Sequence, residues 1–464
     1  MVAIVLALRL LGVQNFGMFS SVLAIVSILS KFVDFGIEPI VFREFSKDKE
    51  NFHLFSSALN LRFVLFIILI LVFNLAAPSL KYSAGELLLT NILFTTIILS
   101  MKTVNFRELL STPFKVHLKM HYPMTLSILD NLILLIMILY IPFAKNAVLY
   151  FVIAYAVSNV PGFVLSFHFL KKKFGYKFEV TLHRAVWLLK ESLPLFGFVI
   201  LTTIFMQIDV VILNYYKGPF AVGIYSAGTR LTMPLNIIPG AIVTTVFPIL
   251  VKRMSDQVNS DFLSNMVVKL LYFIAFAIAA VFTFESNSLI RLILGIEYAS
   301  TSLPASILYW CQVFLFFTYY TLVVLIAKNK QFYNFIYGAI QVIVNVGANF
   351  LLIPKYSFLG AALAKLFASF ASFVFIVFVL NKVGYRPSVG RYKILGWSIL
   401  MCAGFYLLSF LPLIPYLLLS PFLIIILTLV MKLFSEEELL IFFRLVNKES
   451  FGKRIFIKYP YLKS

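Results

Sequence analysis

The fold of this chain is decided by the stretch Gln207-Ile-Asp209-Val-Val-Ile-Leu-Asn214-Tyr-Tyr-Lys217-Gly-Pro-Phe-Ala-Val-Gly223-Ile-Tyr225-Ser-Ala-Gly-Thr-Arg230. It predicts the end of one membrane helix, a tight turn at Lys217-Gly-Pro, and the start of the next helix. At about 1.5 Å per residue, Asp209 and Arg230 would lie roughly 12 and 20 Å from this turn. An ionisable group in hydrocarbon costs at least ~2.5 kcal/mol, so each should face a partner or a wet cavity. The two interpretations are a structural ion pair between consecutive helices and a role in transport.

Composition identifies a membrane protein. Hydrophobic residues make up 61% of the chain, charged residues 12%, and mean hydropathy is +0.98, whereas about a quarter of residues are charged in soluble proteins. The net charge of +20 would suit nucleic acid, but the Lys and Arg residues stand between apolar runs. We interpret them as topology signals and contacts to anionic lipid, and expect no nucleic-acid partner.

Apolar runs suited to membrane helices recur along the whole chain. They cover residues 1–14, 17–40, 60–78, 86–105, 122–143, 147–170, 194–214, 219–250, 266–285, 303–327, 332–353, 358–381, 393–411 and 413–433. These runs predict an all-α polytopic membrane protein of about fourteen spans. The first run reaches only from Met1 to Leu8 before Arg9, which is too short to cross about 30 Å of hydrocarbon. Either the first helix is completed past Arg9 or the natural N-terminus has been lost.

Basic residues mark every second connection between these runs. The basic connections hold Arg43, Lys47 and Lys49; Lys102, Arg107, Lys115 and Lys119; Lys171, Lys172, Lys173, Lys177, Arg184 and Lys190; Lys252, Arg253 and Lys269; Lys328 and Lys330; and Lys382, Arg386, Arg391 and Lys393. The other connections hold one basic residue or none. This alternation predicts a multi-pass protein of the cell membrane with both termini and all basic loops in the cytoplasm.

Two further segments have the pattern of surface helices. Residues 181–192 mix charged side chains with Val186, Trp187 and Leu188, which predicts an amphipathic helix on the cytoplasmic surface. Ser435-Glu-Glu-Glu438 has the form of a capping box, and it begins an amphipathic basic tail that we interpret as a surface anchor.

An internal repeat relates the two halves of the chain. Phe16-Gly17-Met-Phe19-Ser20 matches Val222-Gly223-Ile-Tyr225-Ser226 at an offset of 206, and Ile141-Pro142 matches Ile353-Pro354 at a similar offset. Two six-helix lobes of the same orientation around a central cavity are therefore expected, an arrangement suited to alternating access. The predicted domains are an N-terminal lobe at 1–190, a C-terminal lobe at 191–390, two additional spans at 391–434 and a cytoplasmic tail at 435–464.

Charged residues inside the spans are the candidate functional groups. We count Arg9, Lys31, Asp34, Asp130, Asp209, Arg230, Glu285 and Lys365. Lys31 and Asp34 stand three residues apart and can neutralise each other. Lys365 needs a partner from elsewhere, which favours a cavity-facing position. Asp130 has no basic neighbour within a helical turn, so it is the first choice for a protonatable switch, with a hydrogen-bonded structural carboxylate as the alternative.

A polar stripe and several missing motifs complete the pattern. Gln341, Asn345 and Asn349 follow one another at four-residue spacing, which interhelical hydrogen bonding or ligand contact would explain. The sequence contains no P-loop and no cluster of His and Cys with metal-ligand spacing. We expect no cofactor, no metal and no enzymatic activity such as ATP hydrolysis.

Several motifs resemble one family of membrane transporters. They are Arg9-Leu-Leu-Gly12-Val-Gln-Asn-Phe16-Gly17, Phe32-Val-Asp34-Phe-Gly36-Ile, the stretch from Asp209 to Arg230, and Asn349-Phe-Leu-Leu-Ile353-Pro354. This pattern is similar to the polysaccharide-biosynthesis (Wzx-type) flippases of the multidrug/oligosaccharidyl-lipid/polysaccharide exporter superfamily. The resemblance implies alternating-access export of an isoprenoid-diphosphate-linked oligosaccharide from the inner to the outer leaflet, through a cationic cavity between the lobes.

The resemblance also assigns roles to the charged residues. Arg9, Asp209 and Arg230 fall on matching positions, and depth and charge add Lys31 and Lys365. Substrate binding is thus expected of Arg9, Lys31, Arg230 and Lys365, and coupling or structural pairing of Asp34, Asp130 and Asp209. The expected partners are the lipid-linked oligosaccharide and membrane lipids, with H+ or Na+ as candidate driving ions. The alternatives are a cation-coupled multidrug extruder and a non-transporting scaffold for glycan-synthesis enzymes.

Overall fold

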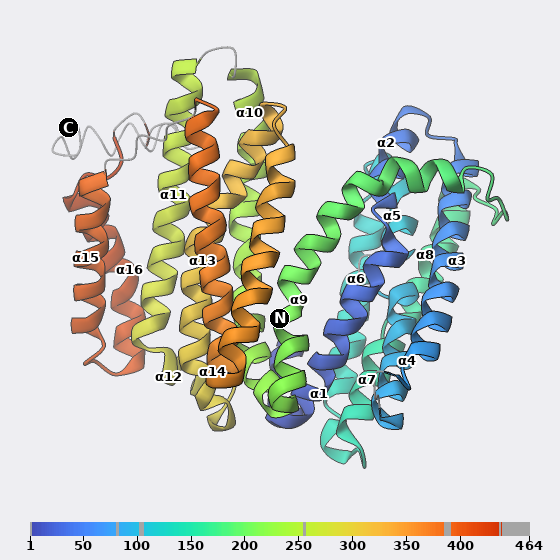
Figure 1. The fold of residues 1–464 in the computed structure, drawn as a ribbon, viewed down its shortest axis with the longest axis horizontal. Coiled ribbons are helices and arrows are strands. Elements are labelled where there is room, and N and C mark those ends of the chain that lie inside the picture. Colours follow the sequence, from blue (N-terminus) through green and yellow to red (C-terminus); the bar gives the residue numbers. More distant parts are fainter. Residues whose placement is uncertain are drawn as a thin grey trace. The chain divides into compact units, whose positions relative to one another are not determined.

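A computed structural model describes residues 2–79, 83–101, 106–253, 257–384, 391–435 and 438, and their regular structure is entirely helical (Figure 1). The predicted all-α membrane fold is confirmed. Nine stretches in these ranges are long and apolar enough to cross a membrane. Some hold more than one crossing, because the 62 residues from Ala185 to Val246 would form a helix about 93 Å long. The number of fourteen spans stays a prediction.

The first helices are divided at glycines. Helix α1 spans Val2–Asp34 and α2 spans Ile37–Lys47. Helix α1 continues through Arg9 and breaks at Gly12, where φ is 72°, a conformation that glycine adopts at little cost. A second break falls at Phe35 and Gly36, which both have positive φ. The breaks therefore differ from the predicted boundaries at residues 14–17 and 40.

The following helices are mostly those that the apolar runs predict. They are α3 Phe52–Ala76, α4 Ala84–Leu99, α5 Phe106–Val116, α6 His121–Ile138, η2 Ile141–Phe143, α7 Ala147–Val157, α8 Val160–Phe174 and α9 Ala185–Thr232. Helix α5 corrects our interpretation of its residues as a basic loop. Its apolar side chains Phe106, Leu109 and Leu110 are buried, at the spacing of one helical face.

The remaining helices include two long ones that are broken in the middle. They are η3 Met233–Asn236, α10 Ile237–Arg253, α11 Gln257–Phe284, α12 Ser286–Ile293, η4 Ile296–Thr301, α13 Ser302–Ala327, α14 Phe332–Lys382, α15 Arg391–Leu408 and α16 Leu413–Val430. Helix α9 breaks at Gly218, where φ is 74°, and α14 breaks at Ser357, where φ is 54°. The turn predicted at Lys217-Gly-Pro is the break at Gly218, with Pro219 beginning the next helical segment.

The chain forms two compact units. The first consists of residues 1–227 and 341–364, and the second of residues 228–340 and 365–464. Each unit combines segments that are far apart in the sequence. The predicted division into lobes at residues 190 and 390 stays a prediction.

In the second unit, an aromatic core holds α15 and α16 against α11. Trp397 packs between Phe273 and Phe276, with ring centroids at 4.4 and 5.6 Å. The hydroxyl of Tyr416 on α16 donates to the carbonyl oxygen of Val281 on α11 at 2.9 Å. The edge-to-face contact between Trp397 and Phe273 adds to the stabilisation from burial alone. These contacts dock the two additional helices on the second unit.

The capping box at residue 435 is present. The backbone nitrogen of Ser435 donates to Glu438 Oε2 at 2.8 Å, and the backbone nitrogen of Glu438 donates to Ser435 Oγ at 3.2 Å. Glu438 also accepts from Lys269 Nζ of α11 at 2.8 Å. The rest of the predicted tail, residues 439–464, lies outside the described residues.

In the first unit, residues 176–181, which precede α9, form hydrogen bonds with α3. The Tyr176 hydroxyl lies 3.0 Å from Ser56 Oγ, and Asn60 Nδ2 donates to the carbonyl oxygen of Glu179 at 2.7 Å. The Glu179 carboxylate also lies 3.0 Å from His53 Nδ1. These contacts make residues 176–181 part of the first unit, directly before the predicted amphipathic helix, which begins at Ala185.

Candidate functional site

Two glycine breaks separated by 206 residues have nearly the same backbone conformation. Gly12 has φ 72° and ψ 170°, and Gly218 has φ 74° and ψ −177°. These breaks share the offset of 206 residues that defines the sequence repeat. The repeat is therefore visible in the backbone as well as in the sequence.

The helices that follow these two breaks cross in reciprocal contact. A methyl group added at Gly17 would overlap the carbonyl oxygen of Pro219 and lie 2.8 Å from the backbone nitrogen of Gly223. A methyl group at Gly223 would overlap the carbonyl oxygen of Val13 and lie 2.9 Å from its carbonyl carbon. Small residues at such crossings let membrane helices approach closely. Val13 is equivalent to Pro219 in the repeat, and Gly17 to Gly223, so equivalent residues lie on both sides of the crossing.

Asp209 is fully buried next to this crossing helix and accepts hydrogen bonds from Tyr225 and Asn349. The Tyr225 hydroxyl donates to Asp209 Oδ2 at 2.6 Å, and Asn349 Nδ2 of α14 donates to Asp209 Oδ1 at 2.6 Å. The predicted pairing of Asp209 with Arg230 stays a prediction. In the sequence, Tyr225 belonged to the repeat and Asn349 to the polar stripe, and both lay in motifs of the family, but neither was predicted to contact Asp209.

The polar stripe of α14 continues from Asn349 into buried surroundings. Gln341, Asn345 and Asn349 are all at least 97% buried. Among the described residues, neither polar atom of the Asn345 side chain has a hydrogen-bond partner, and Asn349 Oδ1 has none. Buried polar groups are nearly always satisfied in native proteins, so unsatisfied amide oxygens one helical turn apart call for an explanation. Oxygen donors beside a carboxylate are the ligands that hard cations prefer.

A buried ion pair in the first unit joins Asp34 to Arg62. Arg62 Nη2 of α3 contacts Asp34 Oδ1 of α1, and both side chains are at least 91% buried. Within the described residues no ion pair joins Asp34 to Lys31, and the neutralisation of one by the other stays a prediction. Arg62 was not identified from the sequence, because it stands at the first turn of an apolar run, where a basic residue usually marks the adjoining loop.

A second buried ion pair joins Asp130 to Arg107. Arg107 Nη1 of α5 contacts Asp130 Oδ2 of α6, and both side chains are almost fully buried. Asp130 has no basic neighbour within a turn of its own helix, but this arginine of α5 supplies its counter-charge. Gly162 of α8 covers the pair, since a methyl group at Gly162 would overlap both Arg107 Nη2 and Asp130 Oδ1. The apolar spacing around Arg107 was the signal that could have identified it as part of a packed helix.

Helix α5 is also tied to α2 by a lysine near its C-terminal end. Lys115 Nζ donates to Glu38 at 2.8 Å and to Glu108 at 2.9 Å. Burial opposes the charge on Lys115, but its hydrogen bonds to the two carboxylates outweigh burial and raise the pKa of this amine. The ammonium therefore stays charged and helps fix α5 in the unit.

The four basic residues expected to bind substrate lie in both units. Arg9 is exposed on α1 and Lys31 is half-buried on the same helix. Arg230 is half-buried near the end of α9, and Lys365 is only 9% exposed on α14. Their common position around one cavity stays a prediction. The part of the chain that the structure describes has no cluster of three His, Cys, Asp or Glu residues suited to a metal ion.

A family model for polysaccharide biosynthesis proteins matches residues 1–254, more than half of the chain. The chain belongs to the polysaccharide biosynthesis protein family. An uncharacterized membrane protein of Methanocaldococcus jannaschii is 23% identical over 400 residues, which are 81% of this chain and 92% of that protein. The capsular polysaccharide biosynthesis protein CapF of Staphylococcus aureus is 24% identical over 213 residues, which are 46% of this chain and 53% of CapF.

Solved structures share the fold of this polysaccharide biosynthesis protein. The lipid II flippase MurJ in an inward closed conformation has a TM-score of 0.73 at 17% identity, with 96% of each chain covered. An inward-facing multidrug transporter of the MATE family has a TM-score of 0.61 at 14% identity, covering 82% of this chain and 93% of that one. The predicted membership in the exporter superfamily is confirmed, and the fold is that of flippases and transporters.

Proposed function

We propose that this protein moves an isoprenoid-diphosphate-linked oligosaccharide from the cytoplasmic to the outer leaflet by alternating access. The observation that carries the proposal is a transporter fold in the polysaccharide biosynthesis family with basic side chains inside apolar helices, above all the buried Lys365. A diphosphate brings about two negative charges, which hydrocarbon cannot solvate. Lys and Arg in a wet cavity would compensate them by charge-assisted hydrogen bonds while the polyprenyl tail stays in lipid.

We assign ion coupling to Asp209. Asp34 and Asp130 each contact a buried arginine, which fits a structural pairing role. Asp209 accepts hydrogen bonds at 2.6 Å from Tyr225 and from Asn349. Asn349 lies one helical turn from Asn345, whose side-chain amide is unsatisfied among the described residues. A proton or Na+ at Asp209 and the neighbouring amide oxygens would change the local charge between states. A driving ion can shift the equilibrium between two states of the transporter only if it binds them with different affinity.

A cell-based experiment tests the transport step. In cells that lack this gene, the lipid-linked oligosaccharide should accumulate and resist a glycosidase added from outside. Expression of the wild type should restore glycosidase access, whereas Arg230→Ala should not, and Arg230→Lys should restore it in part because it keeps the charge. Lys217→Ala is the matched control, since Lys217 is exposed at the turn and should act as wild type. A normal distribution of the intermediate in the deletion would overturn the proposal.

The fold shared with multidrug transporters supports a second candidate, a cation-coupled extruder. In that case, cells without the gene would become sensitive to lipophilic cations, and the lipid-linked intermediate would be distributed normally. A scaffold without transport would instead be rescued by Arg230→Ala as well as by the wild type. The same strains therefore separate the three functions.

A further inference from the structure

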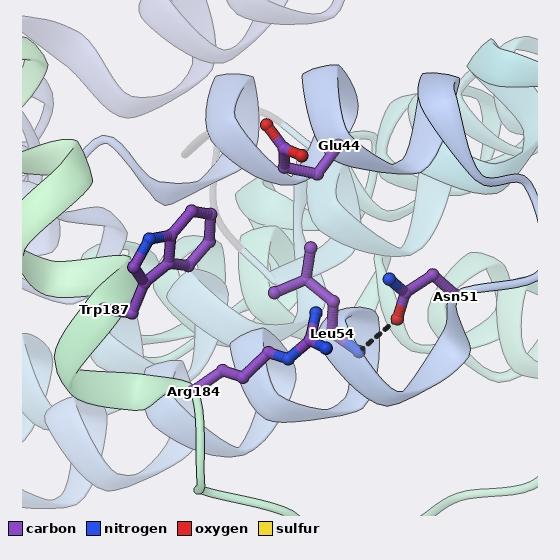
Figure 2. Close-up of a pocket in the computed structure, with 5 residues that line it drawn as sticks. All are labelled: Glu44, Asn51, Leu54, Arg184 and Trp187. Carbon is purple, nitrogen blue, oxygen red and sulfur yellow. Dashed lines mark hydrogen bonds between the residues drawn. The ribbon is translucent and has the colours of Figure 1, made fainter.

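A small cavity lies in the first unit where the segment before α9 meets α2 and α3. Its volume is about 270 Å³, and Glu44, Asn51, Leu54, Arg184 and Trp187 line it. Figure 2 shows Arg184 and Trp187 on one side, from the start of α9, and Glu44, Asn51 and Leu54 on the other, from α2 and the beginning of α3. None of these residues belongs to the proposed transport path.

The acidic groups around this cavity are already neutralised. Glu44 Oε1 accepts from Arg43 Nε at 2.8 Å and from Lys47 Nζ at 2.9 Å. Glu191, on the first turns of α9, accepts from Arg43 Nη2 at 3.0 Å. The side-chain oxygen of Asn51 accepts from the backbone nitrogen of Leu54 at 3.2 Å. The carboxylate of Glu44 is thus paired with basic residues, which leaves the guanidinium of Arg184 as the charged lining group available to a ligand.

Arg184 supplies the donor groups of the cavity. Its side chain is exposed, and within the described ranges it has no carboxylate partner. In Figure 2 its guanidinium extends below Leu54 toward Asn51. A guanidinium is planar and carries several N–H donors, which match the oxygens of a phosphate group. An anion with phosphate oxygens is therefore the ligand that fits.

The surroundings of the cavity favour a lipid over a soluble phosphate. Trp187 is 42% exposed, and on the same helix Val186 and Leu193 are 65% and 56% exposed. Tryptophan is enriched at the level of lipid headgroups, and amphipathic helices lay such apolar side chains against acyl chains. A phosphate held by Arg184 would thus have apolar surface beside it for its acyl chains.

We infer that this cavity binds the headgroup of an anionic phospholipid, with Arg184 on the phosphate and Trp187 beside the glycerol. Arg184 immediately precedes α9, whereas Asn51 caps α3. A bound lipid would therefore fasten the beginning of α9 to α2 and α3. The inference does not depend on the transported substrate.

Native mass spectrometry of the purified full-length protein in detergent tests this site. The wild type should retain phosphatidylglycerol over phosphatidylcholine, and Arg184→Ala should weaken that retention about tenfold, as expected for one charged hydrogen bond. Lys190→Ala is the matched control, because Lys190 is exposed on the same helix and does not line the cavity. Retention that is unchanged in Arg184→Ala, or reduced equally in Lys190→Ala, would overturn the site in favour of diffuse surface attraction.

A competition experiment identifies the source of the phosphate. Millimolar glycerol 3-phosphate should leave bound phosphatidylglycerol in place, because it lacks the acyl chains that contact Trp187 and its apolar neighbours. Displacement of the lipid by glycerol 3-phosphate would contradict a lipid site and indicate one for a soluble phosphate. Arg184→Lys should retain more lipid than Arg184→Ala, since it keeps the charge without the planar donors.

Discussion

Gly17 packs so closely against Pro219 that a methyl group at Gly17 would overlap the Pro219 carbonyl oxygen. Gly223 and Val13 repeat this contact in the opposite sense, at the same offset of 206 residues. The crossing requires glycine at both positions, because the obstructing atoms belong to the backbone and cannot rotate away. It joins the start of the first repeat to the start of the second.

Gly17→Ala and Gly223→Ala should each destabilise the protein by about 1–3 kcal/mol, the usual cost of overpacking a tight site. The measurement is the thermal midpoint of the detergent-solubilised protein. Gly85→Ala is the control, since a methyl group at Gly85 meets no atom within 4 Å. Midpoints that are equal in all three variants would show that the crossing is not as tight as described.

Asp130→Asn should destabilise the protein because it leaves Arg107 buried without its counter-charge. Removing one partner of a buried ion pair typically costs about 3–5 kcal/mol. Replacing both with apolar residues, as in Arg107→Met with Asp130→Leu, should recover much of that loss. A stable Asp130→Asn variant with an altered pH dependence of transport would instead make Asp130 a titrating switch.

Asp209→Asn should remove the ion dependence of transport while leaving the protein folded, because asparagine keeps the shape but not the charge. Transport by proteoliposomes under imposed Na+ and pH gradients is the measurement. Tyr225→Phe removes one donor to Asp209 and should shift the ion dependence without abolishing it. An Asp209→Asn variant with normal gradient dependence would exclude this carboxylate as the coupling site.

Trp397→Ala should cost about 3–5 kcal/mol, because the indole is fully buried between α11, α15 and α16. Tyr392→Ala is the control on the same helix, since Tyr392 is 92% exposed. The free energy of unfolding in denaturant should fall only for Trp397→Ala. An equal loss in both variants would mean that α15 is held by its whole surface and not by the aromatic core.

The helical membrane fold and the turn at Gly218 could be predicted because hydropathy and glycine act locally. The offset of 206 predicted an internal repeat, but the close crossing at Gly17 and Gly223 was seen only in the structure. Partners from distant helices could not be predicted. Asn349 reaches Asp209 across 140 residues, and no pattern within either helix indicates that contact.

Arg62 and Arg107 show why the charge pairs were missed. Basic residues near the ends of apolar runs favour a loop at the cytoplasmic surface when only the sequence is considered. Both arginines are instead buried against carboxylates on neighbouring helices. Whether a basic residue marks a cytoplasmic loop or forms a buried ion pair depends on tertiary packing, and hydropathy gives no information about that packing.

The most direct test of the account is leaflet transfer by the purified protein. Proteoliposomes would carry a radiolabelled polyprenyl-diphosphate oligosaccharide, and the fraction accessible to an external glycosidase would be followed over time. We predict that the wild type equilibrates the label between leaflets and that Lys217→Ala matches it. Arg230→Ala should transfer the label at least about tenfold more slowly, as expected for one lost charged hydrogen bond. The proposed flippase function would be contradicted if folded wild-type protein transferred the label no faster than protein-free liposomes do.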